Sequence, residues 1–182
     1  MFGFSLDLKK YKKYSGKSSI VLFFTQQGLW ALFVYRFYNA VYTGKLPKII
    51  KSLILLFGVL HQKWIEIVTG ISIPYSASIG HSFYIGHFGN IIINSKSVIG
   101  SNCNISQGVT IGVSGRGEKR GVPVIGDNVY MGANATIAGS IAVGNGAVIG
   151  ANSLVISNVA AGTTVVGVPA EQVSSNDSND YI

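Results

Sequence analysis

The stretch "VIGDNVYMGANATIAGSIAVGNGAVIGANSLVISN", residues 124–158, decides the fold, because an aliphatic residue or methionine recurs at every sixth position. These positions are Ile125, Met131, Ile137, Val143, Ile149 and Val155. A period of six matches neither the 3.6-residue period of a helix nor the alternation of an ordinary strand. It suits a short strand followed by a corner, with Gly or Asn carrying the backbone through the turn. Three such faces make one triangular coil, so the sequence predicts a parallel β-helix whose coils stack about 4.8 Å apart.

The same period extends toward the N-terminus. It is kept at Ile93, Ile99, Ile105 and Ile111, and earlier at Ile73, Ile79 and Ile85. A small or branched residue follows four positions later in most repeats, at Ala77, Cys103, Val109, Val129, Ala135, Ala147, Ser153 and Val159. We expect both sets of side chains to point into the coil, where each coil covers the apolar face that the previous one leaves open.

Two interruptions break the period. The step from Ile85 to Ile93 is eight residues long and contains His87, and the step from Ile111 to Ile125 is fourteen residues long and contains "VSGRGEKRGVPV". Both excursions are expected to loop outward, because an inward insertion would destroy the stack. Binding and catalytic residues of solenoids usually lie on such loops.

Charge divides the chain at Gly70. Residues 1–70 carry ten Lys and Arg against two acidic residues, or +8, whereas residues 71–182 carry four against five, or −1, which together give the net +7. The cations are interleaved with aliphatic and aromatic residues and form no nucleic-acid motif. We therefore expect no nucleic-acid partner, and a membrane surface or an anionic substrate instead.

Residues 1–70 are predicted to form a helical segment, with helices over 18–43 and 47–69, the second starting at Pro47 and stopping at Gly70. Their apolar runs are too short to cross a hydrocarbon core of about 30 Å. Two interpretations stay open: the helices pack on the β-helix and on each other in an oligomer, or they rest in the membrane interface. In the second, Trp30, Tyr35, Tyr38 and Tyr42 lie at the headgroup level and Lys9, Lys10, Lys12 and Lys13 contact anionic lipids.

Cysteine usage indicates the compartment. Cys103 is the one cysteine, which excludes a disulfide framework, and no small-residue cleavage site follows the N-terminal lysines. The sequence thus predicts a cytoplasmic protein, peripheral at the inner face of the plasma membrane if the helices contact lipid. Cys103, His61 and His81 are interpreted as structural residues.

At this point the motifs resemble a known family. The hexapeptide repeat, "QGVTIG" at 107–112, the looped insertion and "VVGVPA" at 165–170 are similar to the hexapeptide-repeat acyltransferases, in the serine acetyltransferase-like branch. The resemblance implies a left-handed parallel β-helix, a homotrimer, acetyl-CoA bound between neighbouring subunits, and no metal. The expected organisation is a helical segment at 1–70, an acetyltransferase domain at 71–173 with the loop 113–124, and a disordered polar tail at 174–182.

The resemblance also implies roles for single residues. His87 would be the catalytic base that takes the proton of an acceptor hydroxyl, a task that suits an imidazole with a pKa of about 6.5. Transfer would be direct, with a backbone NH at Gly112 stabilising the oxyanion. The acetyl-CoA contacts implied are Gly112, Val113, Ser114, Ala133, Ala151, Pro169 and Ala170, with Lys119 and Arg120 available for its phosphates.

Several positions depart from the serine acetyltransferase pattern. Ser72, Gly86, Gly121 and Val122 stand where that branch has an aspartate, an acidic residue and an arginine-histidine pair that bind and orient the amino acid. With Ser72 in place of the carboxylate, a backbone carbonyl is expected to accept the second ring nitrogen of His87. Free serine is accordingly not the expected acceptor.

The pattern is most similar to the colanic acid type of capsule, exopolysaccharide and lipopolysaccharide O-acetyltransferases. We predict acetyl transfer to a hydroxyl of a saccharide, free or lipid-linked, in surface polysaccharide biosynthesis. The alternatives are a serine O-acetyltransferase and, from another class, a non-catalytic trimeric β-helix scaffold.

Overall fold

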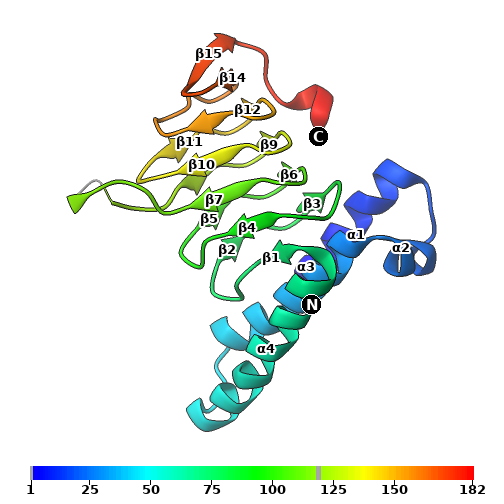
Figure 1. Cartoon of the computed structure of the whole chain (residues 1–182). Helices are drawn as coiled ribbons and strands as arrows, with labels where there is room; N and C mark the ends of the chain where they lie inside the picture. The colour runs from blue at the N-terminus through cyan, green and yellow to red at the C-terminus, as the bar shows by residue number, and fades with distance from the viewer. Residues whose placement is uncertain (1, 118–119) are drawn as a thin grey trace.

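A computed structural model describes residues 2–117 and 120–182 as N-terminal helices that lead into a three-sided coil of short strands (Figure 1). The helices are α1 (Phe2–Ser15), α2 (Ser19–Thr25), α3 (Gln27–Thr43) and α4 (Lys48–Thr69). The strands are β1 (Ile71–Ser72), β2 (Ser78–Ile79), β3 (Tyr84–Ile85), β4 (Ile91–Ile93), β5 (Val98–Ile99), β6 (Asn104–Ile105), β7 (Thr110–Gly112), β8 (Val124–Ile125), β9 (Tyr130–Met131), β10 (Thr136–Ala138), β11 (Ala142–Val143), β12 (Val148–Ile149), β13 (Leu154–Val155), β14 (Thr164–Gly167) and β15 (Ala170–Ser174).

Every third strand joins the same sheet, which makes the coil triangular. Sheet A has the order β1-β4-β7-β10-β13, sheet B β11-β8-β5-β2, and sheet C β15-β14-β12-β9-β6-β3. Pairing is parallel except between β14 and β15. The predicted parallel β-helix is therefore confirmed, with successive coils hydrogen-bonded to one another.

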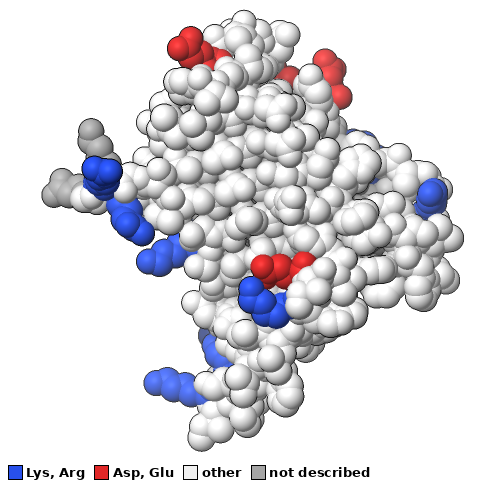
Figure 2. Space-filling view, viewed as in Figure 1, with Lys and Arg blue, Asp and Glu red and all other residues white. Residues whose placement is uncertain are grey.

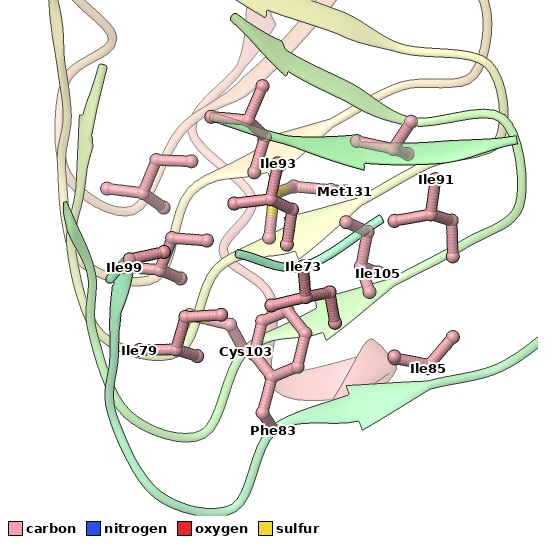
Figure 3. Close-up of a cluster of buried hydrophobic side chains, with 14 of the residues drawn as sticks. Ile73, Ile79, Phe83, Ile85, Ile91, Ile93, Ile99, Cys103, Ile105 and Met131 are labelled. Atoms are coloured by element: carbon pink, nitrogen blue, oxygen red, sulfur yellow. The ribbon is translucent and has the colours of Figure 1, made fainter. Parts of the chain in front are cut away.

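The six-residue period sets the register of the sheets. In sheet A, Ile93 pairs with Ile111, Ile111 with Ile137, and Ile137 with Val155. These side chains and their equivalents in the other sheets are buried, and the close-up in Figure 3 shows Ile73, Ile79, Ile85, Ile93, Ile99, Ile105 and Met131 filling the interior of the coil. The small residues four positions later are buried as well, as predicted.

The helices cap the N-terminal end of the coil, where β2 and β3 would otherwise present unpaired backbone groups. The Tyr35 hydroxyl donates to the Ala77 carbonyl at 2.9 Å and accepts the Ile79 NH at 3.1 Å. In the same way the Tyr11 hydroxyl donates to the carbonyl of Ile85 at 2.9 Å and accepts its NH at 3.0 Å. Both edges thus have hydrogen-bond partners from the helical segment.

A buried ion pair adds to this contact. Arg36 donates to both carboxylate oxygens of Asp7, at 2.8 and 3.0 Å, and also to the carbonyls of Ile79 and Gly80. Asp7 in turn accepts the NH of Phe83 at 2.8 Å. The carboxylate is fully buried, so these hydrogen bonds replace the water that it loses.

The helical segment differs from the sequence prediction in three ways. Tyr35, Tyr38 and Lys10, which the membrane-interface interpretation placed at the lipid headgroups, are buried within the protein. Helix α1 was not predicted, and the single helix expected over 18–43 is broken at Gln26 into α2 and α3, with axes 96° apart. Helix α4 agrees with the predicted 47–69, and Gly70 ends it in a left-handed conformation with φ 66°. By length and hydropathy α4 meets the criteria for a membrane span, which the sequence analysis did not assign to it.

The tail also differs from the disorder expected for it. A short 3-10 helix, η2 (Asn179–Tyr181), lies beside sheet C, where the Tyr181 ring stacks on Tyr130 at 4.5 Å between centroids. The Tyr181 carbonyl accepts a hydrogen bond from the side-chain amide of Asn104 at 2.6 Å, and Ser178 is buried. Contacts to the coil, rather than the composition of the tail, decide its conformation.

Candidate functional site

His87 lies on the corner between sheets C and A, immediately after β3. Gly89 and Asn90 take the chain around this corner at φ 103° and 53°, and the Gly89 carbonyl accepts the NH of Gly108 in the next coil at 2.9 Å. The two extra residues of this repeat therefore push Gly86, His87 and Phe88 outward, as predicted. His87 is exposed, and 53% of Phe88 is exposed.

The ring of His87 is free to act as donor or acceptor toward a ligand. It forms no hydrogen bond with any residue that the structure describes, so the backbone carbonyl expected to orient it is not found within these parts of the chain. Ser72, on β1, is half-buried.

A pocket of about 220 Å³ opens beside His87. One wall is the corner itself, and the opposite wall is the break between α2 and α3, with Thr25, Gln26, Gln27 and Gly28. Apart from His87, no ionisable side chain of the described residues lines it. The sequence analysis placed Gln26, Gln27 and Gly28 inside the single helix expected over 18–43 and missed their place in the site, because nothing in the sequence brings residue 26 next to residue 87.

Four of the residues implied for acetyl-CoA share this corner with His87. Backbone hydrogen bonds join the successive coils at this corner. The NH groups of Gly108, Asn134 and Asn152 donate to the carbonyls of Gly89, Gln107 and Ala133, respectively. Ala133 and Ala151 belong to this column, and the β14–β15 turn with Pro169 and Ala170 lies at its C-terminal end, where Gly167 NH donates to Ser153 Oγ at 3.2 Å. The small side chains leave the backbone of the column accessible.

The remaining implied residues lie on the corner between sheets A and B. Gly112 ends β7, and Val113 and Ser114 begin the loop, which closes on itself through two hydrogen bonds between Ser114 and Gly121 at 3.1 and 3.0 Å. Arg120 is exposed on this loop, and Lys119 lies outside the described residues. Figure 2 shows the cations of the loop projecting to one side of a sheet face that carries little charge.

A hollow of about 490 Å³ lies at the base of the loop. Besides Ser114, its lining includes Gly139, Ser140 and Ile156, which the sequence analysis did not single out. Gly139 has φ 105° and donates to the Gly112 carbonyl at 3.3 Å, so the backbone approaches the loop closely there. Gly139 was not recognised from the sequence, because the aliphatic positions on either side of it keep the six-residue period.

Sheet A separates the two corners. Strand β7 runs from the column of corners that contains His87 to the loop, and five residues of extended chain span roughly 16 Å. His87 and the loop of the same chain consequently face different sides of the coil. A site that uses both needs two chains side by side.

For Cys103, His61 and His81 the structural or rim role stays a prediction, and the structure gives their surroundings. Cys103 is fully buried, and burial raises the pKa of its thiol to about 11, which makes it a poor nucleophile. His81 contacts Ser82 at 3.2 Å, and His61 lies 3.5 Å from the Tyr38 hydroxyl. Neither histidine reaches the pocket beside His87.

The coil is triangular and built of hexapeptides, an exposed histidine lies on one outward corner, and a loop lies on the next corner. Together these features define the hexapeptide-repeat acyltransferases. The family model described as bacterial transferase hexapeptide (six repeats) matches residues 123–157. A serine acetyltransferase of Synechocystis is 38% identical over 159 residues, 87% of this chain and 61% of that protein. One of Bacillus licheniformis is 34% identical over 162 residues, 89% of this chain and 71% of that protein.

A solved serine acetyltransferase in complex with CoA superposes with a TM-score of 0.79 at 29% identity, covering 93% of this chain and 68% of that one. The chain belongs to the serine acetyltransferase family, and its coil is the left-handed parallel β-helix of that family. The acyltransferase class expected from the sequence is thereby confirmed.

The finer prediction is corrected. The similar proteins are serine acetyltransferases, and none of those named supports a capsule or exopolysaccharide enzyme or a role in polysaccharide synthesis. The prediction gave more weight to the departures at Ser72, Gly86, Gly121 and Val122 than to the similarity of the whole sequence. Four positions of a binding site change more easily than the sequence of a whole chain.

Proposed function

We propose that the chain is an acetyl-CoA-dependent O-acetyltransferase in which His87 is the general base. The observation that carries the proposal is the exposed His87 on its outward corner, with a pocket on one side and the column of small residues on the other. His87 takes the proton of an acceptor hydroxyl while the oxygen attacks the thioester carbonyl. The C–S bond then breaks, and the proton passes to the departing CoA sulfur.

The assembly proposed is a homotrimer. The loop and His87 lie on different corners of one chain, so the loop of a neighbouring subunit would complete the site beside His87. Gly112 NH would then stabilise the oxyanion, and Arg120 would contact the phosphates of the CoA moiety.

The relatives favour serine as the acceptor, since the two matched proteins are serine acetyltransferases and each aligns with most of this chain. A neutral hydroxyl compound such as a saccharide is the second candidate. It is favoured by the uncharged lining of the pocket and by Ser72, Gly86, Gly121 and Val122 in place of ionisable residues. The two acceptors differ in charge, so a direct assay separates them.

The test is thiol release from acetyl-CoA by the full chain, with serine or with a panel of neutral and lipid-linked saccharides, followed by mass spectrometry of the product. We expect release with serine and formation of O-acetylserine. Release with saccharides alone would establish the second candidate. If no acceptor supports release and acetyl-CoA does not raise the melting temperature, the scaffold alternative holds, because a ligand of the native state must stabilise it.

A further inference from the structure

The break between α2 and α3 presents two amide side chains to the pocket of His87. Gln26 has an extended backbone with φ −117° and ψ 100°, its NH donates to the Leu22 carbonyl, and its own carbonyl accepts the NH of Leu29. Neither Gln26 nor Gln27 uses its side-chain amide in a hydrogen bond with the residues that the structure describes. Two half-buried amides thus line the pocket with free donors and acceptors.

The position of this break is fixed relative to His87. A Cβ added to Gly28 would lie 2.8 Å from Ile85 Cβ and would also collide with the Tyr11 hydroxyl, so the start of α3 packs directly on β3. The same Tyr11 hydroxyl is hydrogen-bonded to the backbone of Ile85, two residues before His87. The amides and the imidazole are therefore held at opposite walls of one rigid pocket.

We propose that Gln26 and Gln27 bind the carboxylate of a hydroxy amino acid acceptor while its hydroxyl faces His87. This rests on the proposed O-acetyltransferase function and adds to it the residues that select the acceptor. Each amide can donate two hydrogen bonds to carboxylate oxygens. Neutral donors would then take the place of the ionisable residues that are absent at Gly86, Gly121 and Val122, which explains how a serine acetyltransferase fold can keep its acceptor without them.

The pocket has room for such a molecule. At about 220 Å³ it suits an acceptor of amino-acid size, which is smaller than the ligands of typical cofactor sites. Because the walls carry no charge, the carboxylate would be held by hydrogen bonds alone, and a negative charge added to the wall would repel it.

The experiment compares steady-state kinetics of the full chain with Gln26→Ala, Gln27→Ala and Gln27→Glu, using Gln172→Ala as a matched control on exposed β15. Loss of one hydrogen-bonding amide should raise the KM for serine about 10-fold, and Gln27→Glu by more, with kcat and the KM for acetyl-CoA within about 2-fold. The control should match the unaltered chain.

An unchanged KM for serine in both alanine variants would overturn the inference while leaving the O-acetyltransferase function intact. A chain that shows no thiol release with serine but does with a neutral saccharide would contradict the carboxylate assignment directly. Equal loss of kcat and of acetyl-CoA binding in the glutamine variants would also contradict it, since that would mean a general disturbance of the corner.

A different observation carries a second proposal, about the outer face of α4. This face consists of Ile49, Leu53, Leu56, Leu60, Trp64 and Ile67, which lie three or four residues apart and are 55–82% exposed. The opposite side of α4, with Gly58 and Ile65, packs on α3. Ile20 and Phe24 of α2 are each 72% exposed as well. Apolar surface of this extent indicates an interaction site.

Charge identifies the partner. The two carboxylates of residues 2–70 are both paired, Asp7 with Arg36 and Glu66 with Lys63, whereas Lys17, Lys45 and Lys48 are exposed beside the starts of α2 and α4. We infer that the outer face of α4 rests on an anionic bilayer, with these lysines at the headgroups. An apolar face bordered by unpaired cations complements such a surface.

The test is co-sedimentation of the full chain with phosphatidylcholine vesicles, with or without phosphatidylglycerol. We expect binding to the anionic vesicles, weakened by salt, and at least a 10-fold loss for Leu56→Gln/Leu60→Gln, because two leucines no longer enter the apolar layer. Val124→Gln, on exposed β8, is the control and should bind normally. No vesicle binding, or binding that the double variant retains, would overturn the proposal, as would a double variant that instead dissociates an oligomer in sedimentation.

Discussion

The coil and the helical segment differ in the exposure of their aliphatic residues. The inward residues of the coil, such as Ile111, Ile137 and Ile149, are completely buried by their own chain, whereas Ile49 and Ile67 of α4 are 78% and 82% exposed. A repeat that stacks on itself needs no partner to cover its interior. The helices bury one apolar side against the coil and are hydrogen-bonded to it through Tyr11, Tyr35 and the Asp7–Arg36 pair, but they leave a second apolar side outward.

The largest effect expected from this comparison concerns the ion pair of α1 and α3, whose two side chains are also hydrogen-bonded to the coil. Asp7→Ala removes a buried carboxylate that binds Arg36 and Phe83 NH, and it leaves the guanidinium without its counter-charge. We expect a loss of about 3–5 kcal/mol in the free energy of unfolding, measured with urea. Glu66→Ala, which breaks the exposed pair with Lys63, should cost at most about 1 kcal/mol. Equal effects would mean that the helices do not depend on the buried pair.

Paired leucine and isoleucine truncations compare the two regions directly. Ile137→Ala leaves a cavity inside the coil and should lower the free energy of unfolding by about 2–5 kcal/mol. Leu60→Ala on the outer face of α4 should change it by less than about 0.5 kcal/mol, because that side chain is already 65% exposed. A large loss for Leu60→Ala in the isolated chain would show that α4 is more buried than described.

A smaller effect is expected from Lys10, where α1 meets the coil. Its ammonium donates to the carbonyl and side-chain oxygens of Asn102, and burial lowers its pKa from 10.5 to about 8. The folded chain loses this proton near pH 8 while the unfolded chain keeps it to about 10.5, so stability rises with pH between these values.

The neighbours of Lys10 are Asp7, Lys13 and Cys103, and the Cys103 thiol stays neutral in this window because its pKa is raised to about 11. From pH 7.5 to 9.5 the unaltered chain should gain about 1 kcal/mol relative to Lys10→Met in urea unfolding. A constant difference between the two chains would contradict a lowered pKa.

The coil could be predicted from the sequence almost residue by residue. A strict six-step of aliphatics leaves one way to bury them, and each coil depends only on its neighbours, so local pattern and tertiary structure agree. The helical segment could not be predicted so well. The break at Gln26 follows from docking on β3, and α1 is placed by Tyr11 and Asp7, whose partners lie more than seventy residues away.

The residues of the candidate site also differ in how far the sequence pattern predicts them. His87 was found because it breaks the repeat, and the loop for the same reason. Gln26 and Gln27 could not be found in this way, because their place beside His87 depends on a contact between the helical segment and the coil. The saccharide prediction rested on single positions such as Gly86 and Gly121, whereas the similarity over most of the chain points to the serine acetyltransferases.

The most direct test of the account is the turnover of His87→Ala with acetyl-CoA and the acceptor identified in the thiol-release assay. His87 is exposed and forms no hydrogen bond within the described residues, so the variant should keep its melting temperature and its stabilisation by acetyl-CoA. The account predicts that turnover falls by a factor on the order of 100 or more. Turnover equal to that of the unaltered chain would contradict it and remove His87 from the reaction.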